Sequence, residues 1–184
     1  MEAVLFLTDG FEEIEAITTL DILRRGGVDV ASVSLTGGED VTGSHGITVE
    51  ADMMFDEIRG FMGNDTSDAM LILPGGPGVV DYAKHKPLME LLRRHNAANG
   101  RIAAICAAPV VLGELGILHD KTAVCYPALE GKLRAARLGE TPTVTEGNIT
   151  TSKAAGTTMH FALELVRILK GEEEATKVAA SMLA

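Results

Sequence analysis

Cys106 is the residue of this sequence best placed for nucleophilic chemistry. It follows the apolar run Ile102–Ile105, which is typical of a buried strand, and a helical pattern with Pro109 in its first turn begins directly after it. A sharp strand-to-helix turn exposes a reactive atom at the top of a sheet, and the small Ala107 and Ala108 leave room for one. The positive end of the helix would favour the thiolate. We therefore predict a reactive thiol, although a cysteine at a strand end is more often a packing residue.

Three glutamates stand at the start of the helical pattern over Glu12–Arg25: Glu12, Glu13 and Glu15. Acidic residues are common in the first turn of a helix because the helix dipole stabilises them, so their presence alone indicates no function. Glu15 differs because it lies at the edge of the apolar stripe of this helix. A partly buried carboxyl has a raised pKa and can donate a hydrogen bond to a thiolate. Glu15 is therefore a candidate partner for Cys106.

The elements that must position these residues follow from an alternation of strand and helix patterns. Buried strands are predicted at Ala3–Thr8, Val28–Leu35, Ala69–Leu73 and Arg101–Ile105. Continuous apolar runs that alternate with amphipathic helices indicate a parallel sheet covered on both faces. The sequence thus predicts one α/β domain over residues 1–184, with a doubly wound, mainly parallel sheet.

Three further segments have patterns of their own. Ile47–Ala51 alternates like a short strand and is expected to lie outside the main sheet. Val144–Glu146 and Ile149–Ser152 flank Gly147-Asn148, which is typical of a hairpin or of two short strands. Pro127–Arg137 is predicted to form a short helix.

Three loops that leave predicted strands carry suggestive chemistry: Asp9–Glu15, Pro74–Gly78 and Cys106–Pro109. In open α/β sheets the functional crevice lies outside the carboxyl ends of the strands. If the three strands are parallel neighbours, carboxylates, glycine-rich backbone and a thiol meet in one place.

Composition excludes several classes of function. The chain has 184 residues and a net charge of −10, and its lysines and arginines form no stripe, so nucleic acid is not an expected partner. No apolar stretch approaches the ~18 residues of a membrane span. Two cysteines without a secretory signal favour reduced thiols in the cytoplasm. The spacing of histidines, cysteines and acids resembles no metal site, and Gly75–Gly78 lacks the Lys-Ser/Thr of a phosphate-binding loop, so neither metal nor cofactor is expected.

Five stretches, in order along nearly the whole chain, resemble the ThiJ/PfpI superfamily. They are GFEEIEAITTLDILRRGG from Gly10, LILPGGPG from Leu71, GRIAAICAAPVVL from Gly100, YPALEGKL from Tyr126 and TSKAAGTTMHFALELV from Thr151. The resemblance is greatest to the branch that holds the human parkinsonism-associated protein deglycase (DJ-one) and bacterial YajL. It implies a flavodoxin-like fold of the class I glutamine-amidotransferase type and a homodimer.

The resemblance also implies roles for individual residues. Cys106 matches the reactive, oxidisable cysteine of the family, and Glu15 matches the glutamic acid that hydrogen-bonds it. Gly76 and Ala107 match positions whose backbone N–H groups form an oxyanion-like pocket, and Gly75 stands beside them.

The chain departs from the family near this site, both at the three positions that follow and in Thr151–Thr157, where a glycine and a proline of the family are lost. Ala107 replaces the histidine that follows the cysteine in the protease-like branch, which argues against a peptidase. Tyr126 replaces a histidine of the human protein and cannot act as a base near neutral pH as imidazole can. His45 takes the place of a common arginine and can supply either charge or imidazole. Tyr126 and His45 are therefore candidates for substrate contact.

Two functions remain open at this point. The resemblance implies a cofactor-independent glyoxalase or protein deglycase, which acts on small reactive aldehydes such as methylglyoxal or on glycated protein through the Cys106 thiolate. The alternative is a non-catalytic, redox-responsive stress protein or chaperone whose cysteine oxidises to sulfinate. Thiazole biosynthesis, a role also attached to the superfamily, finds no phosphate-binding feature here.

Overall fold

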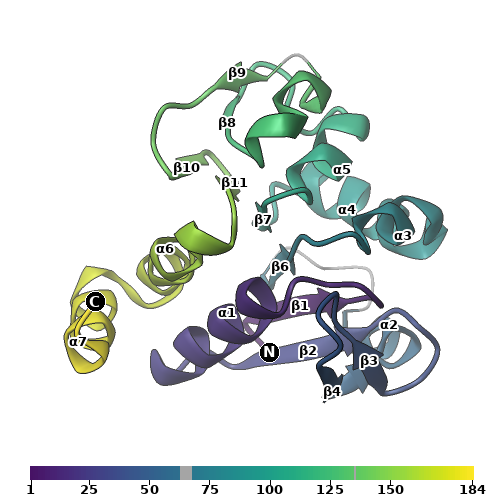
Figure 1. Cartoon of the computed structure of the whole chain (residues 1–184), viewed down its shortest axis with the longest axis horizontal. Helices are drawn as coiled ribbons and strands as arrows, with labels where there is room; N and C mark the ends of the chain where they lie inside the picture. Colours follow the sequence, from purple (N-terminus) through teal and green to yellow (C-terminus); the bar gives the residue numbers. More distant parts are fainter. Residues whose placement is uncertain (63–67, 135) are drawn as a thin grey trace.

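A seven-stranded sheet forms the centre of the structure (Figure 1), a computed structural model that describes residues 1–62, 68–134 and 136–184. The strands in spatial order are β10 (Thr143–Glu146), β11 (Ile149–Ser152), β7 (Ile102–Ile105), β6 (Met70–Leu73), β1 (Ala3–Leu7), β2 (Val30–Ser34) and β5 (Met53–Met54). All neighbours pair in parallel except β10 and β11, which form an antiparallel hairpin. The predicted α/β class and its mainly parallel sheet are confirmed.

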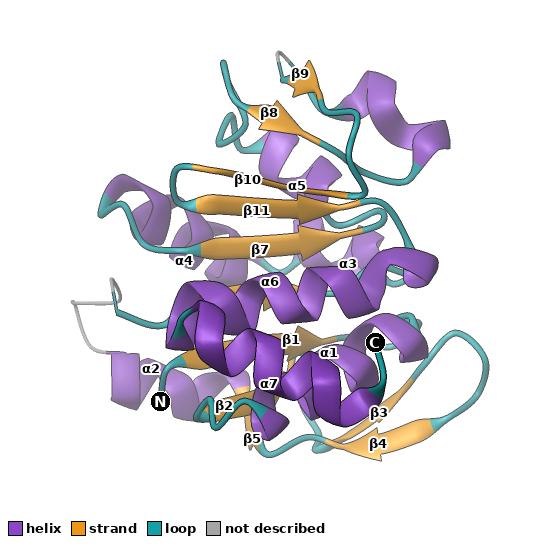
Figure 2. Cartoon of the chain, turned by 90° about the vertical axis from the view of Figure 1, so that its left-hand side faces the viewer, coloured by secondary structure: helices purple, strands orange, loops and turns teal. Residues whose placement is uncertain are grey.

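Helices cover both faces of this sheet (Figure 2). One face carries α1 (Glu13–Arg25) and α6 (Thr158–Lys170), with α7 (Glu172–Met182) packed on α6. The other face carries α2 (Phe55–Met62), α3 (Val79–Lys84), α4 (Lys86–Ala97) and α5 (Pro109–Glu114). Successive side chains of β1 enter opposite cores, since Val4 and Phe6 pack on one face and Leu5 on the other. A strand with two buried faces explains the continuous apolar run in the sequence.

Two small sheets lie apart from the main one. β3 (Asp40–Thr42) and β4 (Thr48–Glu50) pair antiparallel, which confirms that the segment around Ile47–Ala51 leaves the main sheet. β8 (Thr122–Ala123) and β9 (Arg137–Leu138) form a short parallel pair.

The predicted helix over 127–137 is wrong beyond its first turns. A 3₁₀ helix, η1 (Pro127–Lys132), forms instead, and residue 135 of the predicted range lies outside the described residues. Arg134 has a φ of 45°, a left-handed conformation that ends a helical segment. A second 3₁₀ turn, η2 (Ala155–Thr157), precedes α6.

One buried phenol lies between the carboxyl end of β1 and the start of the loop after β6. The Tyr82 hydroxyl lies 3.1 Å from the carbonyl oxygens of both Phe6 and Pro74, to which it can donate. Burial raises the pKa of this phenol, which keeps it protonated. The carboxyl ends of β1 and β6 are thereby held in register where their loops begin.

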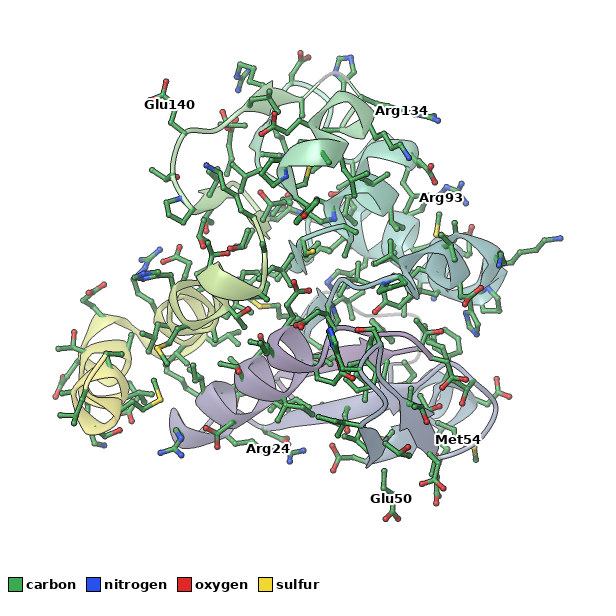
Figure 3. The ribbon with its side chains drawn as sticks, in the orientation of Figure 1. Arg24, Glu50, Met54, Arg93, Arg134 and Glu140 are labelled. Atoms are coloured by element: carbon green, nitrogen blue, oxygen red, sulfur yellow. The ribbon has the colours of Figure 1, made fainter. Side chains whose placement is uncertain are left out.

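The outer surface carries dispersed charge (Figure 3). Arg24, Arg93 and Arg134, on α1, on α4 and after η1, point outward from separate parts of the molecule. Within the described ranges, no helix combines the length and the apolar character needed to cross a bilayer.

Candidate functional site

Cys106 occupies a strained turn between β7 and α5. Its φ is +63°, a left-handed conformation that is uncommon for a residue with a side chain and that clusters at functional sites. Its backbone is held on both sides, because its N–H donates to Ser152 O at 2.9 Å and its carbonyl accepts from Tyr126 N at 2.8 Å. The side chain is half-buried. The sharp turn predicted from the sequence is confirmed.

The loop after β6 approaches this thiol so closely that only glycine fits. A Cβ added at Gly75 would lie 2.7 Å from both Cys106 Cβ and Glu15 Oε2. Gly76 has a φ of +99°, and a Cβ there would lie 2.5 Å from Gly10 O. The loop therefore presents bare backbone to the sulfur. The N–H groups of Gly76 and Ala107 hydrogen-bond it and lower its pKa.

Glu15 reaches the same point from the first turn of α1. It is 1% exposed, and its Oε2 accepts the N–H of Gly75 at 2.7 Å. Burial raises the pKa of this carboxyl to about 7, while the Gly75 N–H and the Cys106 thiol oppose the shift. Its Oε1 is buried without a hydrogen-bond partner among the residues that the structure describes. Glu15 can thus carry a proton at neutral pH beside the thiol.

The surroundings of the Cys106 thiol include groups that raise its pKa and groups that lower it. Burial raises the pKa of Cys106 to about 12, and the negative charge of an ionised Glu15 and hydrogen bonding to it act in the same direction. The helix N-terminus, which we expect from the sequence to favour the thiolate, does not set the pKa of this thiol, because burial and the carboxylate act against it and the pKa is raised. A protonated Glu15 removes the repelling charge and leaves the N–H groups of Gly76 and Ala107 to stabilise the thiolate. The thiol and the carboxyl share protons as a pair.

The remaining predicted residues lie at different depths. Tyr126 is 47% exposed, and its backbone N–H donates to the carbonyl oxygen of Cys106. His45 lies on the turn between β3 and β4 with 70% of its side chain exposed. Cys125 is fully buried and packs in the core on the face of α5, whereas Cys106 contacts the opposite core. The packing role expected for Cys125 fits this position.

Glu13 is a site neighbour that sequence reasoning missed. It is 6% exposed, and its carboxylate accepts the His45 backbone N–H at 2.6 Å and lies 2.7 Å from His45 Nδ1. Burial acts to raise its pKa, but the hydrogen bonds from His45 outweigh it and lower the pKa to about 2. The sequence holds no signal for this burial, because the residues that contact Glu13, Ser44 and His45, lie 31 and 32 positions further along the chain.

Glu12, Glu13 and His45 are also the group, within the described ranges, whose ligating atoms lie close enough to converge on a metal ion. Their atoms already have hydrogen-bond partners, since Glu12 Oε2 accepts the N–H of Glu15 at 2.8 Å and Glu13 binds His45. These hydrogen bonds explain why the three side chains lie close together.

Comparison with known proteins places this geometry in a family. The model of the DJ-1/PfpI family matches residues 1–168. Protein dj-1beta of Drosophila melanogaster is 34% identical over 184 residues, which cover 98% of this chain and 96% of that protein. The glutathione-independent glyoxalase DJR-1.2 of Caenorhabditis elegans is 32% identical over 173 residues, with 93% and 89% covered.

A longer relative and a solved structure agree with this placement. Protein DJ-1 homolog B of Arabidopsis thaliana is 37% identical over 177 residues; these are 95% of this chain but 39% of that protein, so the chain spans well under half of its length. The structure of oxidized Toxoplasma gondii DJ-1 superposes with a TM-score of 0.91 at 33% identity and covers 98% of this chain and 97% of its own. From its family match and these full-length similarities, the chain belongs to the DJ-1/PfpI family, in its DJ-1 branch.

Proposed function

We propose that the protein is a cofactor-independent glyoxalase that converts 2-oxoaldehydes such as methylglyoxal into 2-hydroxy acids, with glycated protein as a related substrate. One observation carries the proposal. The sulfur of Cys106, on a strained turn, is surrounded by the N–H groups of Gly76 and Ala107 and by the buried carboxyl of Glu15. A nucleophile, an oxyanion site and an acid–base group are the parts that this reaction needs. The similarity to a glutathione-independent glyoxalase supports it.

The reaction begins when the Cys106 thiolate attacks the aldehyde carbon. A C–S bond forms, the π electrons of the carbonyl move to oxygen, and the Gly76 and Ala107 N–H groups stabilise that charge until the protonated Glu15 donates its proton to it and becomes a carboxylate. The product is a hemithioacetal. Attack by sulfur from a fixed turn holds the substrate within reach of Glu15.

Glu15 then moves the proton that isomerises the adduct. Its carboxylate removes the hydrogen of the former aldehyde carbon, a double bond forms between the two carbons, and an enediol results. Return of the proton to the second carbon gives a thioester, so one carbon is oxidised and its neighbour reduced without an external redox agent. Water hydrolyses the thioester and releases the hydroxy acid and the thiol. A pKa of about 7 suits Glu15 to both halves of this transfer.

Lactate formation from methylglyoxal, without glutathione or added metal, tests the proposal. We expect wild type and Cys125→Ser to form lactate, and Cys106→Ser and Glu15→Gln to lose at least about 100-fold in kcat/KM. Cys125→Ser is the matched control because it removes a thiol that lies in the core. Lactate formation that is equal in wild type and Cys106→Ser would overturn the proposal.

A non-catalytic redox role is the second candidate, favoured by the same N–H groups. Donors that stabilise a thiolate also stabilise the oxygens of a sulfinate, and a relative has been solved in an oxidized form. If this role is correct, mild peroxide adds two oxygens to Cys106 while no lactate forms. Mass spectrometry of wild type and Cys106→Ser distinguishes this outcome.

We further propose a homodimer that uses α1. Ile14 and Ile17, one turn apart on this helix, are 55% and 40% exposed and form an apolar pair that a second copy of the chain could cover. Light scattering should give twice the chain mass of 19.4 kDa for wild type, and Ile17→Glu should give the monomer mass. A monomeric wild type would contradict this proposal and leave the assignment of the thiol site intact.

A further inference from the structure

His85 stands between α3 and α4, and its side chain caps α4. Nδ1 of the ring accepts the N–H of Leu88 at 3.1 Å. The ring meets that of Phe55 edge to face, with the centroids 4.6 Å apart and the planes at 73°. These two contacts fix the orientation of the imidazole. Serine, threonine, asparagine and aspartate are the usual capping residues, so a histidine at this position brings a second ring nitrogen that capping leaves unused.

The second ring nitrogen, Nε2, is a hydrogen-bond donor at neutral pH. Burial lowers the pKa of His85 below its ordinary value, and the smaller effects of a backbone hydrogen bond and of the Asp56 charge oppose this shift. The ring is therefore mostly neutral at pH 7 and carries one proton. Because Nδ1 accepts a hydrogen bond, that proton is on Nε2. Among the residues that the structure describes, Nε2 has no acceptor.

The imidazole of His85 forms part of the wall of a cavity of about 330 Å³. This volume is within the range of small-molecule sites, roughly 300–1,000 Å³. The cavity lies where β2 and β5 end, at the carboxyl edge of the sheet, and ligands of open α/β folds bind at that edge. Much of its wall is apolar and comes from separate segments of the chain: Leu35, Met54 (labelled in Figure 3), Phe55 and Pro87.

The polar residues of this wall differ in what they offer a ligand. The Ser34 hydroxyl is engaged within its own loop, since it accepts the N–H of Thr36 at 3.2 Å and lies 3.0 Å from the Thr36 hydroxyl. Asp56 contributes a negative charge, which acts on His85. A ligand in this cavity therefore meets apolar surface, one oriented donor on His85 and a charge that repels anions.

We propose that this cavity is a binding site, separate from the thiol site, for one small uncharged aromatic heterocycle. The flat ring packs against Phe55 and the other apolar residues, and a ring nitrogen or carbonyl oxygen on its edge accepts the Nε2–H of His85. Apolar walls with a few placed polar groups are typical of sites for such molecules. The site is independent of the chemistry at Cys106, because β1 and β6 lie between β2 and β7 and the three strand spacings amount to about 14 Å.

An NMR titration of the full chain with nicotinamide tests the proposal, because nicotinamide is an uncharged pyridine with a carbonyl group. We expect shift changes at the residues around the cavity, and a downfield shift of the His85 Nε2 proton as it gains an acceptor. Nicotinate has the same ring but carries a carboxylate, and we expect it to bind about tenfold more weakly because Asp56 repels it. Cyclohexanecarboxamide keeps the carbonyl group without the flat ring and should also bind more weakly.

Two variants change the cavity in different ways. His85→Ser removes the ring donor but keeps a good capping residue at the start of α4. It should weaken nicotinamide binding at least about tenfold, and urea denaturation checks that the fold is intact. Met54→Trp fills part of the cavity, leaves His85 in place and should abolish binding. The matched controls are His119→Ser, whose histidine is 69% exposed and lies outside the cavity, and Cys106→Ser; both should bind nicotinamide as wild type does.

The outcomes decide the proposal without reference to turnover. Shift changes confined to residues outside the cavity, or none up to the solubility of nicotinamide, would overturn it. Unchanged binding in His85→Ser, or equal binding of nicotinamide and either of the other two compounds, would overturn it as well, because the donor, the charge or the flat ring would then not select the ligand. Lactate formation plays no part in these measurements, so a negative result here leaves the glyoxalase proposal intact, and the reverse also holds.

Discussion

Glu13 and Glu15 stand two residues apart in the first turn of α1, are both buried, and have opposite pKa shifts. The pKa of Glu13 is lowered to about 2 and that of Glu15 is raised to about 7. The difference lies in their partners, because Glu13 receives its hydrogen bonds from Ser44 and His45, whereas Glu15 accepts one from Gly75. One turn of helix thus supplies a permanent anion on one side and a titrating acid on the other.

Glu15→Gln should stabilise the protein at neutral pH. A raised pKa in the folded state means that the contribution of Glu15 is fully present below pH 4.5 and is lost as the pH rises to about 7. This loss is on the order of 3 kcal/mol in the free energy of unfolding, and Gln does not incur it. Urea denaturation at pH 4 and pH 8 measures the effect. An equal difference between the two proteins at both pH values would contradict the raised pKa.

Glu13→Gln should destabilise the protein near neutral pH but not in strong acid. A lowered pKa means that the contribution of Glu13 is present above pH 4.5 and is lost as the pH falls toward about 2. Wild type should therefore be more stable than Glu13→Gln at pH 6, and the two should converge near pH 2. Acid titrations followed by circular dichroism measure this, with the exposed Glu50→Gln on β4 as the control.

Gly76→Ala should destabilise the protein by about 2–4 kcal/mol and abolish turnover. A φ of +99° strains any side chain, and the new Cβ would meet Gly10 O, which moves the N–H that faces the sulfur. Gly38→Ala is the matched control, because nothing lies within 4 Å of its Cβ position and its φ is not left-handed. Chemical denaturation of both variants measures the free energy of unfolding. Equal values for Gly76→Ala and Gly38→Ala would contradict the strain at Gly76.

Tyr82→Phe should lower the free energy of unfolding by about 1–2 kcal/mol, because it removes the fully buried hydroxyl that bridges Phe6 O and Pro74 O. Tyr126→Phe removes an exposed hydroxyl and should leave the free energy of unfolding within about 0.5 kcal/mol of wild type. Urea denaturation compares the two variants. A larger cost for Tyr126→Phe would mean that its hydroxyl has a partner in solution.

Thiol labelling should distinguish the two cysteines. Native protein should take up one iodoacetamide at Cys106, at least about tenfold faster than at Cys125, because Cys106 is half-buried whereas Cys125 is fully buried and closed to the reagent. Peptide mass mapping gives the site, and native Cys106→Ser should remain unlabelled. In denaturant both cysteines should react, which controls for the reagent.

The sequence by itself predicted the main strands, the sheet class and Cys106 as the candidate nucleophile. Apolar runs of four or five residues can be buried on both faces only in a covered parallel sheet, and the loops at the carboxyl ends of such strands meet, so the proximity of the loops that carry Glu15, Gly76 and Cys106 was predictable. The end of the helical segment in 127–137 was not predictable. A single left-handed residue, Arg134, stops it, and helical periodicity does not report backbone handedness.

Tertiary structure alone decided the protonation of the site. The pKa of a carboxyl depends on which donors surround it after folding, and the donors to Glu13 come from Ser44 and His45 on a hairpin whose docking no local pattern encodes. The same holds for Cys106, where burial and Glu15 outweigh the helix position on which the sequence argument relied. Residue types and spacing predict the candidate reacting groups, and long-range contacts set their charge.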